Sequence, residues 1–147
     1  MIFLLAGCTK GEEEPQHYSG IISNEEVLGY EYIITRENNI STWIIRHKEK
    51  HTIVEESAEN KDDLLRFMYA VNDSHDNLSS LIIWITNLLI IMVISYYFYQ
   101  KARKNSKDYT VIIVIAISIA MYLVFNAFIE FTSAYQSLKL HYFRLTN

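Results

Sequence analysis

The sequence predicts a small α+β domain, with about three antiparallel strands and one helix, followed by two transmembrane helices that form a hairpin. Two long apolar runs, 78–100 and 109–131, indicate the transmembrane part, because each can cross about 30 Å of hydrocarbon as a helix. Short stretches of β-branched and aromatic residues between 27 and 55 indicate the strands. A chain of 147 residues has room for one such soluble domain beside the helices.

Charge is distributed unevenly along the chain. Residues 9–80 contain fifteen Asp and Glu and seven Lys and Arg, a net charge of −8, whereas the whole chain carries −4. An acidic domain is repelled by phosphate backbones, so we expect no nucleic-acid partner. The single cysteine excludes an internal disulfide and a multi-thiolate zinc site within the chain. We therefore expect a domain without a cofactor, held together by packing.

The first element is the segment 1–8, which ends in Leu5-Ala6-Gly7-Cys8 and precedes a polar tether, 9–26. The tetrapeptide resembles the lipobox of bacterial lipoproteins. The resemblance implies cleavage before Cys8, a diacylglycerol on the Cys8 thiol and an extracytoplasmic position for the residues that follow. The apolar stretch is short and no positive charge precedes it, so we interpret 1–8 as a truncated signal peptide. The alternative is a cysteine that follows small residues by chance.

Residues 27–77 form the predicted extracytoplasmic α+β domain. We expect strands at 27–35, 41–47 and 51–55 that pair as a meander. Asparagine tolerates positive φ, so the sequence Arg36-Glu37-Asn38-Asn39 predicts a turn between the first two strands.

The second turn and the aromatic residues complete the predicted sheet. Lys48-Glu49-Lys50 is expected to form a three-residue hairpin tip. The aromatic side chains of Tyr30, Tyr32 and Trp43 are expected to form the core, and an aromatic recognition patch is the alternative.

A helix is predicted after Ser57, with Asn60 as its N-cap. Its apolar stripe can cover one face of the sheet; the stripe consists of Leu64, Leu65, Phe67, Met68 and Val71. The next segment, 72–77, is dense in Asn, Asp and Ser, and we predict that it is a hinge to the first membrane helix. Its spacing lacks the glycine and terminal glutamate of an EF-hand loop, which disfavours calcium binding.

The loop at 101–108 predicts the topology. It carries four cations, Lys101, Arg103, Lys104 and Lys107. Positive loops face the cytoplasm, so the α+β domain and the amphipathic tail at 132–147 are expected outside, with the bacterial cell membrane as the location. The tail is expected either to extend the second helix or to lie on the outer surface.

Few polar residues interrupt the apolar runs. Asn87 and Asn126 lie at similar depth if each helix rises 1.5 Å per residue, and we predict an interhelical hydrogen bond between their amides. A polar path is the alternative. Glu130 lies near the outer surface and is expected to be solvated.

His47 and His51 flank the predicted hairpin tip and are expected to oppose each other across two strands. They are weak candidates for metal ligands, because a zinc site needs three or four ligands, and only Glu49 and His17 could approach. A solvated pair or a pH sensor are the other interpretations. No motif for hydrolysis, phosphate binding or dinucleotide binding occurs, so we do not expect an enzyme; the alternative is a metal-dependent surface enzyme that uses His47 and His51.

These features lead us to expect a small bacterial membrane lipoprotein that serves as an accessory, sensing or protective subunit. Its expected partners are membrane lipids and an envelope or membrane protein. The alternative is a self-assembling homo-oligomer of hairpins that forms a pore or transporter subunit. Neither helix has the continuous polar stripe of a water-filled lining, which counts against a pore.

Overall fold

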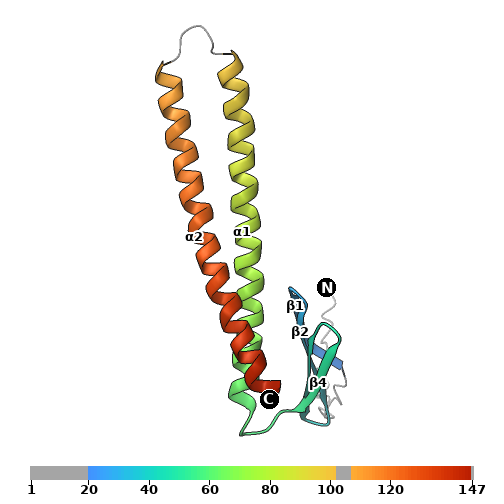
Figure 1. The fold of residues 1–147 in the computed structure, drawn as a ribbon. Helices are drawn as coiled ribbons and strands as arrows, with labels where there is room; N and C mark the ends of the chain where they lie inside the picture. The colour runs from blue at the N-terminus through green and yellow to red at the C-terminus, as the bar shows by residue number, and fades with distance from the viewer. Residues whose placement is uncertain (1–19, 102–106, 147) are drawn as a thin grey trace, which may run out of the picture.

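The computed structural model describes residues 20–101 and 107–146, which form a four-stranded sheet followed by two long antiparallel helices (Figure 1). The elements are β1 (Gly20–Val27), β2 (Tyr30–Glu37), β3 (Ile40–His47), β4 (Lys50–Glu55), α1 (Lys61–Lys101) and α2 (Lys107–Thr146). The predicted layout of an α+β domain followed by a helical hairpin is confirmed. The predicted number of strands is wrong, because the sheet has four.

The additional strand is β1, and most of it lies in the segment that we expected to be a tether. It pairs with β2 in antiparallel register from Gly20↔Arg36 to Val27↔Tyr30. Leu28 and Gly29 both have positive φ, 49° and 80°, as a two-residue hairpin turn requires. This turn divides the stretch 27–35 that we predicted as a single strand.

The sheet is a meander with the order β1-β2-β3-β4. The predicted turn between β2 and β3 is confirmed, with Asn38 at φ 50° and Asn39 at φ 68°. The predicted three-residue tip between β3 and β4 is wrong. His47 pairs with Lys50, which leaves a two-residue turn.

One face of the sheet packs against the helices and forms the core. The buried side chains recur at every second residue of β2 and β3 and at every third or fourth residue of the helices, as each geometry requires. They are Val27, Tyr30, Tyr32, Ile34, Trp43, Ile45, Leu64, Phe67, Ala70, Val71, Leu138 and Tyr142. The prediction that the aromatic residues of the sheet form its core is therefore confirmed.

The predicted hinge at 72–77 is wrong, because α1 continues through it without a break. Two of its polar residues are taken up by the fold: Asn72 accepts a hydrogen bond from the sheet, and Ser74 is fully buried. The tail likewise continues α2, and its Leu138 and Tyr142 enter the core. Both helices therefore run unbroken from the apolar runs into the folded domain.

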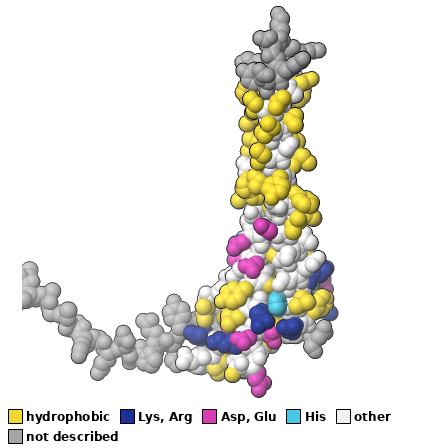
Figure 2. Space-filling view, turned by 90° about the vertical axis from the view of Figure 1, so that its left-hand side faces the viewer, with side chains coloured by type: hydrophobic (Ala, Val, Ile, Leu, Met, Phe, Trp, Pro, Cys, Tyr) yellow, Lys and Arg dark blue, Asp and Glu magenta, His cyan; other side chains and the backbone are white. Residues whose placement is uncertain are grey.

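We call the sheet, residues 61–80 of α1 and residues 132–146 of α2 the head, and residues 81–101 and 107–131 the hairpin. The helices have 41 and 40 residues, so each is about 60 Å long. In Figure 2, hydrophobic side chains cover the half of the helices away from the sheet, and charged side chains gather toward the sheet. The head thus lies at the end of the hairpin opposite the connection between the helices (Figure 1).

Candidate functional site

The hairpin presents an apolar surface along most of its length. Both helices are long and apolar enough to span a membrane, and only 6% and 11% of their most apolar windows are buried within the chain. The core helix of a soluble protein would be mostly buried. Exposed apolar surface of this extent requires hydrocarbon or another protein to cover it.

A shallow groove runs between the two helices of the hairpin. Its volume is about 450 Å³. It is lined by Leu81, Ile85, Leu88, Met121, Val124, Phe125 and Phe128. The lining offers no hydrogen-bonding side chain, so the groove suits only apolar groups such as acyl chains or aliphatic side chains.

Asn87 lies on the exposed surface of this hairpin. Its Nδ2 donates to the carbonyl oxygen of Ile83 one turn earlier, at 2.9 Å. Asn126 is half-buried on α2. The predicted hydrogen bond between Asn87 and Asn126 stays a prediction. The amide of Asn87 keeps a carbonyl oxygen and a second N–H with which it can bind a partner.

A polar seam joins the sheet to α1 in the head. The Tyr32 hydroxyl donates to Asn72 Oδ1 at 3.0 Å, and Ser23 Oγ lies 3.3 Å from the same hydroxyl. Beside it, His75 Nδ1 lies 3.0 Å from Glu25 Oε1. The seam fixes the first two strands of the sheet on the helix that enters the hairpin.

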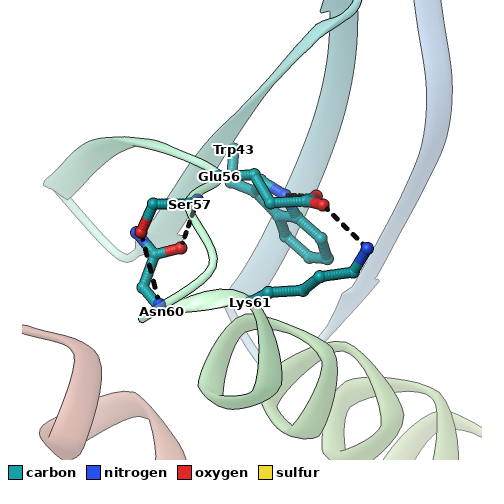
Figure 3. A network of polar contacts seen from close by, with 5 residues as sticks. All are labelled: Trp43, Glu56, Ser57, Asn60 and Lys61. Carbon is teal, nitrogen blue, oxygen red and sulfur yellow. Dashed lines mark hydrogen bonds and ion pairs between the residues drawn. The ribbon is translucent and has the colours of Figure 1, made fainter.

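The connection between β4 and α1 is held by a second network (Figure 3). Trp43 Nε1 donates to Glu56 Oε2 at 3.0 Å, and Lys61 Nζ lies 3.4 Å from Glu56 Oε1. Asn60 precedes α1 as predicted, but its Oδ1 accepts from the Ser57 amide at 2.7 Å. The Asn60 side chain therefore closes the loop that leads into the helix.

An aromatic cluster joins the sheet to α2. Tyr30 stacks on His47 with a centroid distance of 3.8 Å, and Tyr142 meets both rings edge-on at 5.2 and 5.3 Å. Tyr135 approaches Tyr30 edge-on at 6.2 Å. Burial raises the pKa of the Tyr30 phenol, and the neighbouring phenols of Tyr135 and Tyr142 raise it further. His47 is thus part of the head's packing.

The expectation that His47 and His51 oppose each other is wrong. The register pairs His47 with Lys50 and Arg46 with His51. Directly paired residues share a face and adjacent residues alternate, so the two histidines lie on opposite faces of the sheet. Within residues 20–101 and 107–146, no group of three or more His, Cys, Asp or Glu is arranged to hold a metal ion.

A cavity opens beside the aromatic cluster, between the β3–β4 turn and the end of α2. Its volume is about 850 Å³. It is lined by Tyr30, His47, Lys48, Glu49, Lys50, His51, Thr52, Tyr142, Phe143 and Thr146. Sequence reasoning did not identify this cavity, because its walls come from segments about 90 residues apart.

Cys8 and His17, singled out in the sequence, lie outside the described residues. Comparison of the chain with models of protein families, with curated proteins and with solved structures gives no match.

Proposed function

We propose that this protein is a membrane-anchored accessory subunit whose head binds another protein at the bacterial cell envelope. The observation that carries the proposal is the shared core of the head, in which the sheet packs on the extensions of both hairpin helices. A protein bound to the head would therefore be held at a fixed position relative to the membrane. A structural change that it causes in the head would reach both helices, because they share the core of the head.

Membrane insertion is supported by length and exposure together. An apolar helix of about 20 residues crosses the hydrocarbon core, and the runs on both helices reach that length. All backbone groups inside a helix are hydrogen-bonded, which removes the largest cost of insertion. The exposed aliphatic surface of the hairpin then contacts lipid.

In the proposed topology the loop at 101–108 faces the cytoplasm, and the head lies outside. Cysteine labelling tests this in a Cys8→Ser background. A cysteine at Asn38, in the exposed β2–β3 turn, should react with a membrane-impermeant maleimide in intact cells. A cysteine at Ser106 should react only after the cells are permeabilised. The reverse pattern would refute the topology.

Intact-mass analysis of the protein from its native membrane tests the proposed lipidation. A chain that begins at Cys8 and carries acyl groups would establish a lipoprotein. An unmodified Met1 would remove the lipid anchor from the proposal and leave the hairpin as the only anchor.

The outer face of the sheet is the surface that we propose for the partner. Ile33, Ile44 and Ile53 are aligned across three strands on the face away from the helices. Four glutamates lie at flanking outward positions, Glu26, Glu31, Glu37 and Glu55, and Arg46 on the same face pairs with Glu31. An apolar centre with a charged rim is typical of protein interfaces. The partner should therefore be a protein with an apolar patch and a basic rim.

Substitution of Ile53, whose side chain is 64% exposed, tests this surface. Ile53→Lys should abolish co-purification of the partner in mild detergent. The matched control is Leu140→Lys, which changes an apolar residue of similar exposure (58%) on α2. Purification of the chain alone from its native membrane, or equal loss of the partner in both variants, would count against the proposal.

Exposed Asn87 favours a second candidate function, a self-assembling pore or transporter subunit. Two amides from neighbouring copies can pair through N–H···O bonds, which contribute about 0.6 to 2 kcal/mol in membranes. An Asn87→Leu, Asn126→Leu double variant should then fail to assemble. Normal assembly and function of that variant would remove the support for this candidate.

A further inference from the structure

We propose that the cavity between the β3–β4 turn and the end of α2 binds a small anion that carries a flat apolar ring. The inference does not depend on the membrane topology or on the protein partner proposed above. It rests on three properties of the cavity: its size, its concentration of positive charge and its aromatic wall.

The cavity has the size of a small-molecule site. Its volume of about 850 Å³ lies within the range of roughly 300 to 1,000 Å³ that is usual for ligand pockets. Its base is preorganised, because Tyr30 and His47 are already stacked and Tyr142 packs against both rings. A ligand would therefore not need to order these side chains.

Positive charge is concentrated at the cavity although the head is acidic. Residues 20–80 contain twelve Asp and Glu but only six Lys and Arg. Lys48 and Lys50 both line the cavity, and Glu49 is the one acidic residue among the described residues of the lining. Among the described residues, neither lysine forms a salt bridge. These ammonium groups are available to an anion.

The turn holds Lys48 in a defined position. Its backbone has φ 56°, and its amide donates to the Gly29 carbonyl oxygen at 3.2 Å. The same carbonyl oxygen lies 3.3 Å from His47 Nδ1. The first lysine of the cavity is therefore anchored to the neighbouring β1–β2 turn at its backbone, which limits the volume that its ammonium group samples.

The opposite wall of the cavity is aromatic. Phe143 lines the cavity and is 56% exposed, so its ring is open to a ligand. Aromatic rings pair in offset or edge-to-face arrangements that contribute beyond the area they bury. A ring against Phe143 together with a carboxylate, sulfate or phosphate near the lysines would use both walls. This combination defines the ligand class.

Fluorine NMR with trifluoromethylbenzoate as the probe tests the proposal on the full-length protein in phosphatidylcholine nanodiscs. The expected result is saturable binding by the wild-type protein. A Lys48→Asn, Lys50→Gln variant should bind at least about tenfold more weakly, because two charge-assisted contacts are lost. Asparagine is chosen because it tolerates the positive φ of Lys48.

The matched control is an Arg36→Gln, Arg66→Gln variant, which removes two exposed cations of the head outside the cavity and should bind the probe normally. Phe143→Ala should weaken binding of the benzoate probe but leave the much weaker binding of inorganic phosphate unchanged. Absence of saturable binding by the wild-type protein would overturn the proposal. Equal affinity of the lysine variant and its control would also overturn it, as would equal binding of the neutral trifluoromethylbenzyl alcohol.

Discussion

The hydroxyl of Tyr32 on β2 donates a hydrogen bond to Oδ1 of Asn72 on α1 at 3.0 Å, across forty residues of sequence. Tyr32 is also in the core, with 2% of its surface exposed. The contact therefore gives a hydrogen-bond acceptor to the buried Tyr32 hydroxyl and a donor to the Asn72 side chain within α1. It explains how α1 tolerates a segment rich in turn-forming residues.

Tyr32→Phe should lower the free energy of unfolding by about 1 to 2 kcal/mol, because it leaves the half-buried Asn72 amide without this donor. Thermal unfolding in nanodiscs, followed by circular dichroism, measures the loss. Tyr69→Phe is the control, since Tyr69 is 58% exposed on the same helix and should lose little. Equal stability of the two variants would show that the hydrogen bond contributes nothing.

Glu56 should be needed as a hydrogen-bond acceptor more than as a charge. Glu56→Ala leaves the buried Nε1 of Trp43 unpaired and should cost about 1 to 3 kcal/mol. Glu56→Gln retains an acceptor oxygen and loses mainly the ion pair with the exposed Lys61, so it should cost less than about 1 kcal/mol. Denaturant midpoints compare the variants. A loss as large for Gln as for Ala would contradict this assignment.

Ser74→Ala should stabilise the protein. The Ser74 side chain is fully buried, and its Oγ has no hydrogen-bond partner among residues 20–101 and 107–146. Removal of an unsatisfied hydroxyl from a helix, together with the higher helix propensity of alanine, should raise the free energy of unfolding by about 1 kcal/mol. Ser79→Ala is the control, because Ser79 is exposed on the same helix and its replacement gains only the higher helix propensity of alanine. Denaturant midpoints compare the two variants with the wild type. A lower midpoint for Ser74→Ala would show that the Ser74 hydroxyl has a stabilising partner.

Tyr30 should make the head sensitive to alkaline pH. Its folded-state pKa is raised above the unfolded value of 10.0, mainly by burial. The unfolded state therefore loses the phenolic proton first, and stability falls as pH rises from 10.0 toward the folded pKa. Below pH 10.0 this contribution is fully present.

Comparison of the wild type with Tyr30→Phe isolates this effect. The unfolding free energy of the wild type minus that of Tyr30→Phe should be constant near about pH 8. It should fall above about pH 10, because only the wild type has a phenol that ionises there. Unfolding midpoints over that range measure it. A difference that stays constant to about pH 11 would mean that Tyr30 ionises equally in both states.

The β-meander illustrates how local patterns succeed and fail. Asn38 and Asn39 tolerate positive φ, so the turn between β2 and β3 was predictable from two residues. β1 was not predictable in the same way, because Asn24, Glu25 and Glu26 interrupt its apolar pattern. Among the described residues β1 is an edge strand of the sheet, and its Glu25 contacts His75, so it needs few apolar residues to belong to the sheet.

The histidines show the effect of a single residue on register. A three-residue tip would place His47 opposite His51, whereas the two-residue turn places His47 opposite Lys50. A shift of one position moves a side chain to the other face of a strand. The cavity that contains His47 depends further on Tyr142 and Phe143, which reach the sheet only through the return path of α2.

Local patterns in the sequence were enough to predict the two apolar helices, the separation of charge, a meandering sheet and the aromatic residues of its core. These properties follow from the spacing of hydrophobic residues, the composition of each segment and its turn-forming residues, all of which can be read within a short stretch of chain. Three features could be seen only in the folded protein: residues 72–77 continue a helix, β1 joins the sheet, and a basic, aromatic cavity forms beside α2. Each of these features depends on a partner far along the chain, such as Tyr32 for Asn72. Such a partner supplies the hydrogen bond or the packing that local preference lacks.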